Sequence, residues 1–402
     1  MSNAEIDVLV SEVGPRDGLQ SVKRTMPTAK KLEWLAALAE AGLREIEVGS
    51  FVSPKLLPQM ADCADVVAGA RRIDGLTVLA LVPNLKGAER AFAAGVHKVN
   101  LPVSASRLHS KSNINMTPEQ AVEQVAAVCR LRADHPEYRD IGVEAGIATA
   151  FGCTMEGPVS EDWVMQLAAM VAEAGADVVG LSDTTGYANP AQIKRMFKRL
   201  RSELGDKCGG AHLHNTRGQG LANVVAALDV GVTTFDSSQG GLGGCPYAKS
   251  ATGNLATEDL VWMLDGAGVE SGVDLDALVE TSAWMAQQLG KPLWIVWAGR
   301  EFSQRLTTVG RFPAPEQKPP AANSNDHKQN CAQPKPSGRL WQHGNGRGIR
   351  HWLQQIDQFG KIEAVPRINH GNGRLPTKVS PVSRWTCGIV SSPALNGRTG
   401  RP

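Results

Sequence analysis

The sequence has no pair of cysteines at the spacing that structural zinc sites use. Its seven cysteines are odd in number and scattered, which argues against a disulfide framework and favours reduced thiols in a cytoplasmic protein. No apolar run approaches the roughly 20 residues that a membrane-spanning helix needs. The first residues, Met1–Asp7, include neither a basic nor an apolar region, so we expect no signal peptide and no membrane partner.

An excess of charge of one sign is also missing, since the chain has 42 Lys and Arg against 40 Asp and Glu. This balance hides two different parts. Residues 1–300 carry 27 basic and 35 acidic side chains, whereas residues 301–402 carry 15 basic and 5 acidic ones. A slightly acidic body gives no reason to expect nucleic-acid binding.

The C-terminal part, residues 301–402, also holds 11 of the 23 prolines. We therefore expect it to be a basic, Pro/Gly-rich and largely disordered tail that follows a catalytic domain at residues 1–300. A tail that binds a partner and a tail read in an altered frame are the alternatives.

Short β-branched apolar runs alternate with segments of helical spacing, of which residues 29–41 and 163–174 are the clearest. Eight strand–helix units predict an α/β fold, the (β/α)8 TIM barrel. The alternative is an open doubly wound sheet, which the lack of a glycine-rich dinucleotide motif after the first strand disfavours. The predicted strands are residues 6–13, 45–49, 77–82, 97–103, 141–149, 177–182, 209–214 and 232–237.

Polar residues lie at the ends of most of these runs. In a TIM barrel the ends of all strands meet on one face, where active sites lie. Residues far apart in the sequence are therefore expected to form one site. They are Arg16, Asp17, Glu47, Asn84, Asn100, Asp183, His212, His214 and Asp236.

The pair His212 and His214 on one strand directs both imidazoles to the same face, because side chains alternate with period two. Alone, such a pair is more often a packing or hydrogen-bonding feature. Asp17 after the first strand and Asn254 after the eighth add two oxygens from neighbouring strands. Two nitrogens and two oxygens suit Mg²⁺ or Mn²⁺, so we predict a divalent-metal site.

A glycine-rich segment, Gly241–Ala248, follows the eighth strand and contains Cys245. It is either a turn with an incidental thiol or a lid whose glycines give it hinge freedom. A thiol near a metal or cation can transfer a proton. Arg16, beside Asp17, could stabilise an enolate oxygen, form a salt bridge with Glu47, or do both.

Several motifs together resemble those of 3-hydroxy-3-methylglutaryl-CoA (HMG-CoA) lyases. The similarity runs in order from about residue 8 to about residue 290, within a wider group of metal-dependent barrels that includes isopropylmalate and homocitrate synthases. The GGCPYA loop is the marker for the lyase branch. The motifs are Val13–Gln20, Ile46–Lys55, Pro58–Asp62, Asn113–Asn115, Gly241–Ala248 and Gly253–Asp259.

The resemblance implies a role for each matching residue. The metal ligands would be Asp17, His212, His214 and Asn254. Arg16 would stabilise the enolate and Cys245 would transfer a proton, as His212 could also do, while Glu47 and Asp183 would support the site. Gln20 would lie near the ligands, and Asn113 and Asn115 would help to hold the CoA moiety of an acyl-CoA substrate. The family also suggests a homodimer and a place in leucine degradation.

The implied reaction is the cleavage of HMG-CoA to acetyl-CoA and acetoacetate. The sequence departs from the family pattern at Asn215–Gln219, Ser182–Gly186 and Cys153–Met155. These segments lie on the mouth side of the predicted barrel, so the acyl group stays open. The alternatives are citramalyl-CoA or a longer branched 3-hydroxyglutaryl-CoA, a Claisen-type acyl-CoA synthase, and a non-catalytic barrel scaffold.

Overall fold

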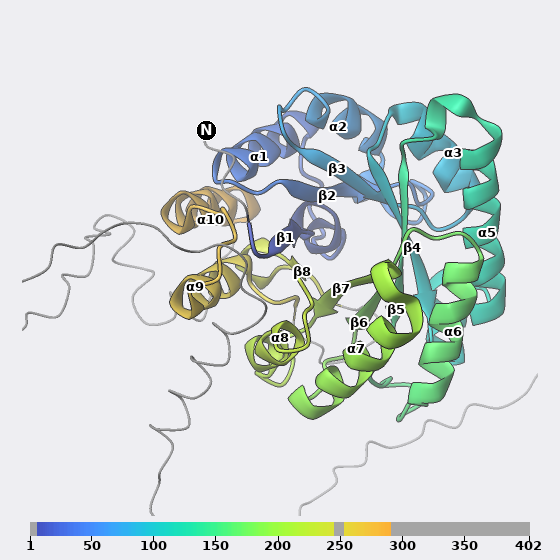
Figure 1. Ribbon diagram of the computed structural model, residues 1–402. Coiled ribbons are helices and arrows are strands. Elements are labelled where there is room, and N and C mark those ends of the chain that lie inside the picture. The colour runs from blue at the N-terminus through green and yellow to red at the C-terminus, as the bar shows by residue number, and fades with distance from the viewer. Residues whose placement is uncertain (1–5, 245–252, 291–402) are drawn as a thin grey trace, which may run out of the picture. The chain divides into compact units, whose positions relative to one another are not determined.

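Eight parallel strands close into one barrel in chain order, which confirms the predicted TIM barrel (Figure 1). The computed structural model describes residues 6–244 and 253–290. Strand β1 pairs with both β2 and β8, so the sheet closes on itself. The strands are β1 (Leu9–Glu12), β2 (Glu45–Ser50), β3 (Thr77–Leu81), β4 (Lys98–Ser104), β5 (Gly142–Ala148), β6 (Val178–Asp183), β7 (Cys208–Leu213) and β8 (Thr234–Ser237).

Helices follow the strands and surround the barrel (Figure 1). The two clearest helical patterns in the sequence correspond to α1 and α6. The helices are α1 (Thr28–Glu40), α2 (Cys63–Ala70), α3 (Leu85–Ala94), α4 (Arg107–Ile114), α5 (Pro118–Asp134), α6 (Glu161–Glu173), α7 (Pro190–Leu204), α8 (Gly220–Leu228), α9 (Thr257–Ala267) and α10 (Leu275–Leu289).

Local sequence signals explain where several helices begin and end. Thr117 forms a capping box with Gln120 at the start of α5, and the Asn189 side chain accepts a hydrogen bond from the Gln192 N–H at the start of α7. Gly95 ends α3 in the left-handed conformation, with a φ of 83°, which a side chain would disfavour.

The core lies between the strands and the helices. On β5, the outward-facing Val143, Ala145 and Ile147 are at most 1% exposed and belong to one hydrophobic cluster. The predicted domain boundary near residue 300, and the whole predicted tail, lie outside the described residues. Within the described part, no helix is long and apolar enough to cross a bilayer.

Candidate metal centre

Arg16 and Asp17 lie in η1 (Gly14–Gly18), a π-helical turn that directly follows β1. The Asp17 N–H donates to the Val13 carbonyl at 2.7 Å. Turns of this kind are rare in proteins, and many of those that occur lie at functional sites. Both side chains line the cavity at the barrel mouth, so the turn converts the end of the first strand into a wall of the site.

The Arg16 guanidinium bridges two carboxylates. Its Nε donates to Glu47 Oε2 at 2.5 Å and its Nη1 donates to Asp17 Oδ1 at 2.6 Å. Burial raises the pKa of Glu47 to about 7, although the charge of Arg16 acts in the opposite direction. Burial also acts to raise the pKa of Asp17, but the positive charges of Arg16 and His212 outweigh it and hold that pKa below its usual range. Asp17 is therefore an ionised carboxylate in a buried position.

His212 is the last β7 residue that pairs with β8, and His214 follows it by two residues on the same side. Their Nε2 atoms are 3.2 Å apart. The Nδ1 of His212 lies 3.0 Å from Asp236 Oδ2, because His212 and Asp236 are partners in the β7–β8 register. A carboxylate on one ring nitrogen orients the other nitrogen towards a metal ion.

The two imidazoles differ in their electrostatic surroundings. Burial lowers the pKa of His214 to about 3, and the charge of His212 adds to this effect. His214 is therefore neutral at physiological pH, which is the form that ligates metals. Burial also acts to lower the pKa of His212, but the hydrogen bond and charge of Asp236 outweigh it and raise that pKa.

Asn254 completes the cluster from the loop after β8. It pairs with His214 in an isolated antiparallel bridge. Its Nδ2 donates to Asp17 Oδ2 at 2.7 Å and to the Leu242 carbonyl at 3.1 Å. Within the described residues, its buried Oδ1 has no hydrogen-bond partner. A buried amide oxygen without a donor is suited to accept a cation.

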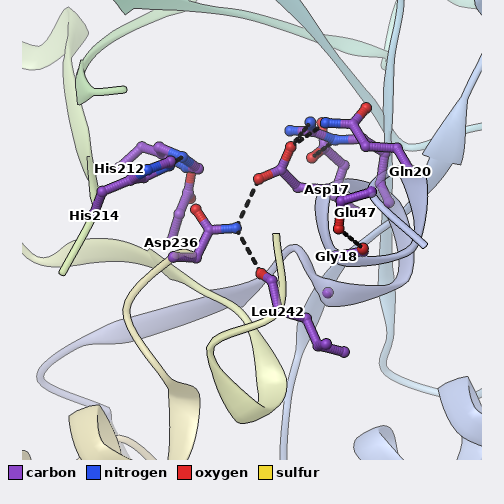
Figure 2. Close-up of polar contacts among 12 residues, drawn as sticks. Asp17, Gly18, Gln20, Glu47, His212, His214, Asp236 and Leu242 are labelled. Atoms are coloured by element: carbon purple, nitrogen blue, oxygen red, sulfur yellow. Dashed lines mark hydrogen bonds and ion pairs between the residues drawn. The ribbon is translucent and has the colours of Figure 1, made fainter. Parts of the chain in front are cut away.

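These residues fit a divalent ion. One ligand atom each from Asp17, His212 and His214 lies within 4.8 Å of the other two. Figure 2 shows the two imidazoles facing the Asp17 carboxylate. An ionised carboxylate, imidazole nitrogens and the free Asn254 oxygen are the donor set that Mg²⁺ or Mn²⁺ accepts. The four ligands predicted from the sequence are thus brought to one place.

Gly243, in the described part of the glycine-rich segment, packs directly against these ligands. Gly243 has a φ of 119°, and a Cβ there would lie 2.6 Å from Asn254 Nδ2 and 3.0 Å from Asp17 Oδ2. A side chain at this position would collide with the centre as well as strain the backbone. Cys245, the predicted proton-transfer residue, lies outside the described residues.

The other predicted residues take different places. Gln20 Nε2 donates to Asp17 Oδ1, as expected for a residue near the ligands. Asp183 is buried and does not belong to the residues that line the cavity. Its Oδ1 accepts from the N–H groups of Tyr187 at 2.8 Å and Ala188 at 3.1 Å. Burial raises its pKa to about 6. Asn113 on α4 and Asn115 at its C-terminal end line the same cavity as the metal centre, although no contact joins them to the ligands.

Two features of the site were not predicted from the sequence. Asp236 was expected at the end of a strand, but its pairing with His212 depends on the register of β7 against β8. The second feature is Lys98, whose Nζ contacts Glu45 Oε2 at 2.7 Å and Glu144 Oε1 at 2.9 Å inside the barrel. The available signal was the spacing of polar residues: Lys98 and Asn100 are two positions apart on β4, and Glu144 lies between the apolar Val143 and Ala145 on β5.

Comparisons with known proteins agree with this architecture. The family described as HMGL-like matches residues 7–285. Human mitochondrial hydroxymethylglutaryl-CoA lyase is 41% identical over 284 residues, which is 71% of this chain and 86% of the relative. The Bacillus subtilis hydroxymethylglutaryl-CoA lyase is 39% identical over 286 residues, covering 71% and 94%.

Solved structures show the same relationship. An HMG-CoA lyase from Acinetobacter baumannii, in complex with coenzyme A and 3-methylmalate, has a TM-score of 0.70 and 39% identity, covering 76% of this chain and 98% of that one. The carboxyl transferase domain of Rhizobium etli pyruvate carboxylase, at 21% identity and a TM-score of 0.56, shares the fold alone; the match covers 71% of this chain and 47% of that one. The chain therefore belongs to the HMGL-like family, among the HMG-CoA lyases, and is a carbon–carbon lyase.

Proposed function

We propose that this protein cleaves the C2–C3 bond of HMG-CoA to give acetyl-CoA and acetoacetate. The observation that carries the proposal is the contact chain from Glu47 through Arg16 and Asp17 to Asn254, facing His212 and His214 across the cavity. It combines a metal site made of a carboxylate and two imidazoles with a guanidinium that is held in place, and an enolate-forming cleavage needs both.

The ion would be Mg²⁺ or Mn²⁺, held by Asp17, His212, His214 and Asn254. When bound, such an ion supplies Lewis-acid polarisation of substrate oxygens. The protein's residues do the remaining work. Gln20, which donates to Asp17, holds this carboxylate on the side opposite to Asn254.

The reaction begins when the 3-hydroxyl of the substrate loses its proton. We assign the acceptance of that proton to the His212–Asp236 pair, in which Asp236 stabilises positive charge on the imidazole. The C2–C3 electron pair then moves onto the thioester as an enolate, while C3 becomes the carbonyl of acetoacetate. A ring nitrogen that holds the ion cannot accept this proton, so His212 would act as the base in a site where Asp17, His214 and Asn254 hold the ion.

Arg16 stabilises the enolate oxygen. Glu47 and Asp17 hold two of its nitrogens, so the guanidinium is already in place when negative charge develops. Cys245 donates the proton that converts the enolate carbon C2 into the methyl group of acetyl-CoA, either directly or through a water molecule. Asn113 and Asn115 are the proposed contacts for the CoA moiety.

The test is a turnover assay with purified protein, Mg²⁺ or Mn²⁺, and HMG-CoA. We expect acetyl-CoA and acetoacetate in equal amounts, detected separately by chromatography and an acetoacetate-specific reduction assay. Release of neither product at any metal concentration would refute the proposed reaction. If the protein instead cleaves a related thioester to acetyl-CoA and a different carbonyl product, the proposed type of reaction would stand and the proposed substrate would be wrong.

A further inference from the structure

The inside of the barrel is more accessible than the surface of the sheet that faces the helices. On β5 the outward residues are buried, whereas the inward-facing Glu144, Gly146 and Ala148 are only partly buried. The same alternation continues on β4, β6 and β8. TIM-barrel interiors are normally filled by layers of bulky side chains, so this interior is unusually open.

A continuous cavity of about 760 Å³ occupies this space. It is lined at the mouth by Asp17 and His212 and at the strand starts by Val178, Cys208 and Thr233. Its volume lies in the upper part of the range of about 300–1,000 Å³ that small-molecule sites occupy. The same cavity also extends above the mouth, where Leu56 and Asn113 line it. The volume therefore covers the mouth and the interior together, and the metal centre lies between the two parts.

One inward-facing position on β5, Gly146, and one on β6, Gly180, are glycines. A Cβ on Gly180 would lie 2.9 Å from the Gly210 carbonyl oxygen, so the open space is the one beside Gly146. Gly146 and Gly180 are partners in the register, and both line the cavity. A Cβ on Gly146 would lie 3.4 Å from Ser182 Oγ and 3.8 Å from Asn100 Oδ1, which is ordinary van der Waals contact. The barrel therefore has room for a side chain at position 146, and the glycine leaves that space empty. Ser182 is the register partner of His212, so this space adjoins the metal centre.

Charge determines what the chamber can accept. Lys98 is paired with both Glu45 and Glu144. Arg201 is a second lining cation at the strand starts, and Asp236 adds a further carboxylate. The lining residues of this inner part therefore carry more negative than positive charge. A second carboxylate on a substrate would be repelled there, whereas an uncharged alkyl branch would meet Leu81 and Pro102.

We propose that the chamber receives the substituent on C3 of the substrate, and that this protein prefers 3-hydroxyglutaryl-type thioesters whose 3-substituent is uncharged and longer than methyl. This inference rests on the proposed function, because it uses the same metal centre to place C3. Gly146 is the specificity-determining position, since it leaves open the space beside Ser182 and Asn100.

The test compares CoA thioesters that carry methyl, propyl or hexyl at C3, and a carboxyethyl analogue. In the wild type, kcat/KM is expected to rise about fourfold for each methylene that is buried, until the chamber is filled. The carboxyethyl analogue should be at least tenfold poorer than the propyl compound. In Gly146→Val the hexyl-to-methyl ratio of kcat/KM should fall at least tenfold, and in Gly146→Ala it should fall less.

The matched control is Gly266→Ala on α9, where a Cβ meets nothing within 4 Å. It should leave the hexyl-to-methyl ratio unchanged. A wild-type enzyme that cleaves the methyl compound and rejects propyl and hexyl would overturn the proposal, as would a ratio that Gly146→Val leaves unchanged.

Binding separates this proposal from the proposed reaction. Glutaryl-CoA analogues with the same 3-alkyl groups but no 3-hydroxyl cannot be cleaved, and calorimetry measures their affinity directly. Affinity that rises with alkyl length in the wild type and not in Gly146→Val would support the chamber even if no thioester were cleaved. Affinity that is flat or falls with length would refute it, whatever the turnover assay shows.

Discussion

Replacing Asp236 should weaken metal binding without touching a metal ligand. Asp236 Oδ2 lies 3.0 Å from His212 Nδ1, and the two side chains are 28% and 16% exposed. This carboxylate fixes the tautomer that leaves Nε2 free for a metal ion. Loss of such a partner typically weakens metal affinity by about 10–100-fold, or roughly 1.4–2.7 kcal/mol. Asp236→Ala should fall in this range.

The amide variant should be milder and should depend on pH in a defined direction. Asp236→Asn keeps an oxygen that accepts from Nδ1 but loses the charge, which we expect to cost about fivefold in affinity. Burial lowers the pKa of His212, and Asp236 raises it above its ordinary value. In the variant that pKa falls, so protons compete less with the ion. The deficit should be largest at pH 8, where the imidazole is neutral in both proteins, and smaller near pH 6.

The assay is calorimetric titration with Mn²⁺ at pH 6 and pH 8. The control is Asp162→Ala, which removes a carboxylate that is 86% exposed and paired with Arg199 far from the barrel interior. A deficit in Asp236→Ala below twofold at both pH values would refute the positioning role. A deficit equally large in the control would show that the assay reports overall charge and not orientation of His212.

Three further predictions concern the centre itself. Gly243→Ala should lower both Mn²⁺ affinity and kcat at least tenfold, because its Cβ would lie 2.6 Å from Asn254 Nδ2; parity with Gly266→Ala would contradict this. Arg16→Lys should lower kcat by about 10²–10³-fold with little change in metal affinity, since one ammonium cannot replace the guanidinium fork between Glu47 and Asp17; retained turnover would exclude Arg16 from stabilising the enolate. Chelation of the metal should abolish turnover, and Mn²⁺ at about 100 times Kd should restore it. The added Mn²⁺ should also stabilise the folded protein by about 2.7 kcal/mol. An unchanged melting temperature would contradict binding of the ion to the folded state.

The strands were predictable because each is a short apolar run bounded by turn residues, and seven of the eight differ from their predicted ranges by no more than two residues at either end. The exception is β1, which begins at Leu9 and not at residue 6. The convergence of Asp17, His212, His214 and Asn254 followed from the closure of the barrel alone. It needed only the order of the strands, and not their exact register.

Features that depend on the register between strands could not be predicted from the sequence. The pairing of His212 with Asp236 requires both residues at the same height on adjacent strands. Gly146 could be assigned to a strand, but only the packed barrel shows that Ser182 and Asn100 leave space beside it. The identity of an inward-facing residue is local information, whereas the volume around it is a property of several strands together.

The open interior has a consequence for stability that can be separated from specificity. The barrel is held mainly by its outer face, where Val143, Ala145 and Ile147 are buried against the helices. Replacing Gly146 by Ala or Val restricts the unfolded chain, and its backbone does not lie in the left-handed region, so about 0.4–1 kcal/mol of stabilisation is expected.

For a domain of this size that gain corresponds to a rise of roughly 1–4 °C in melting temperature, measurable by calorimetry in the absence of substrate. A higher melting temperature together with a lower hexyl-to-methyl ratio would show that the glycine is kept for the substrate at a cost in stability. A fall in melting temperature for both variants would instead mean that the space beside Gly146 is needed by the fold, and the change in specificity could then not be attributed to filling the chamber.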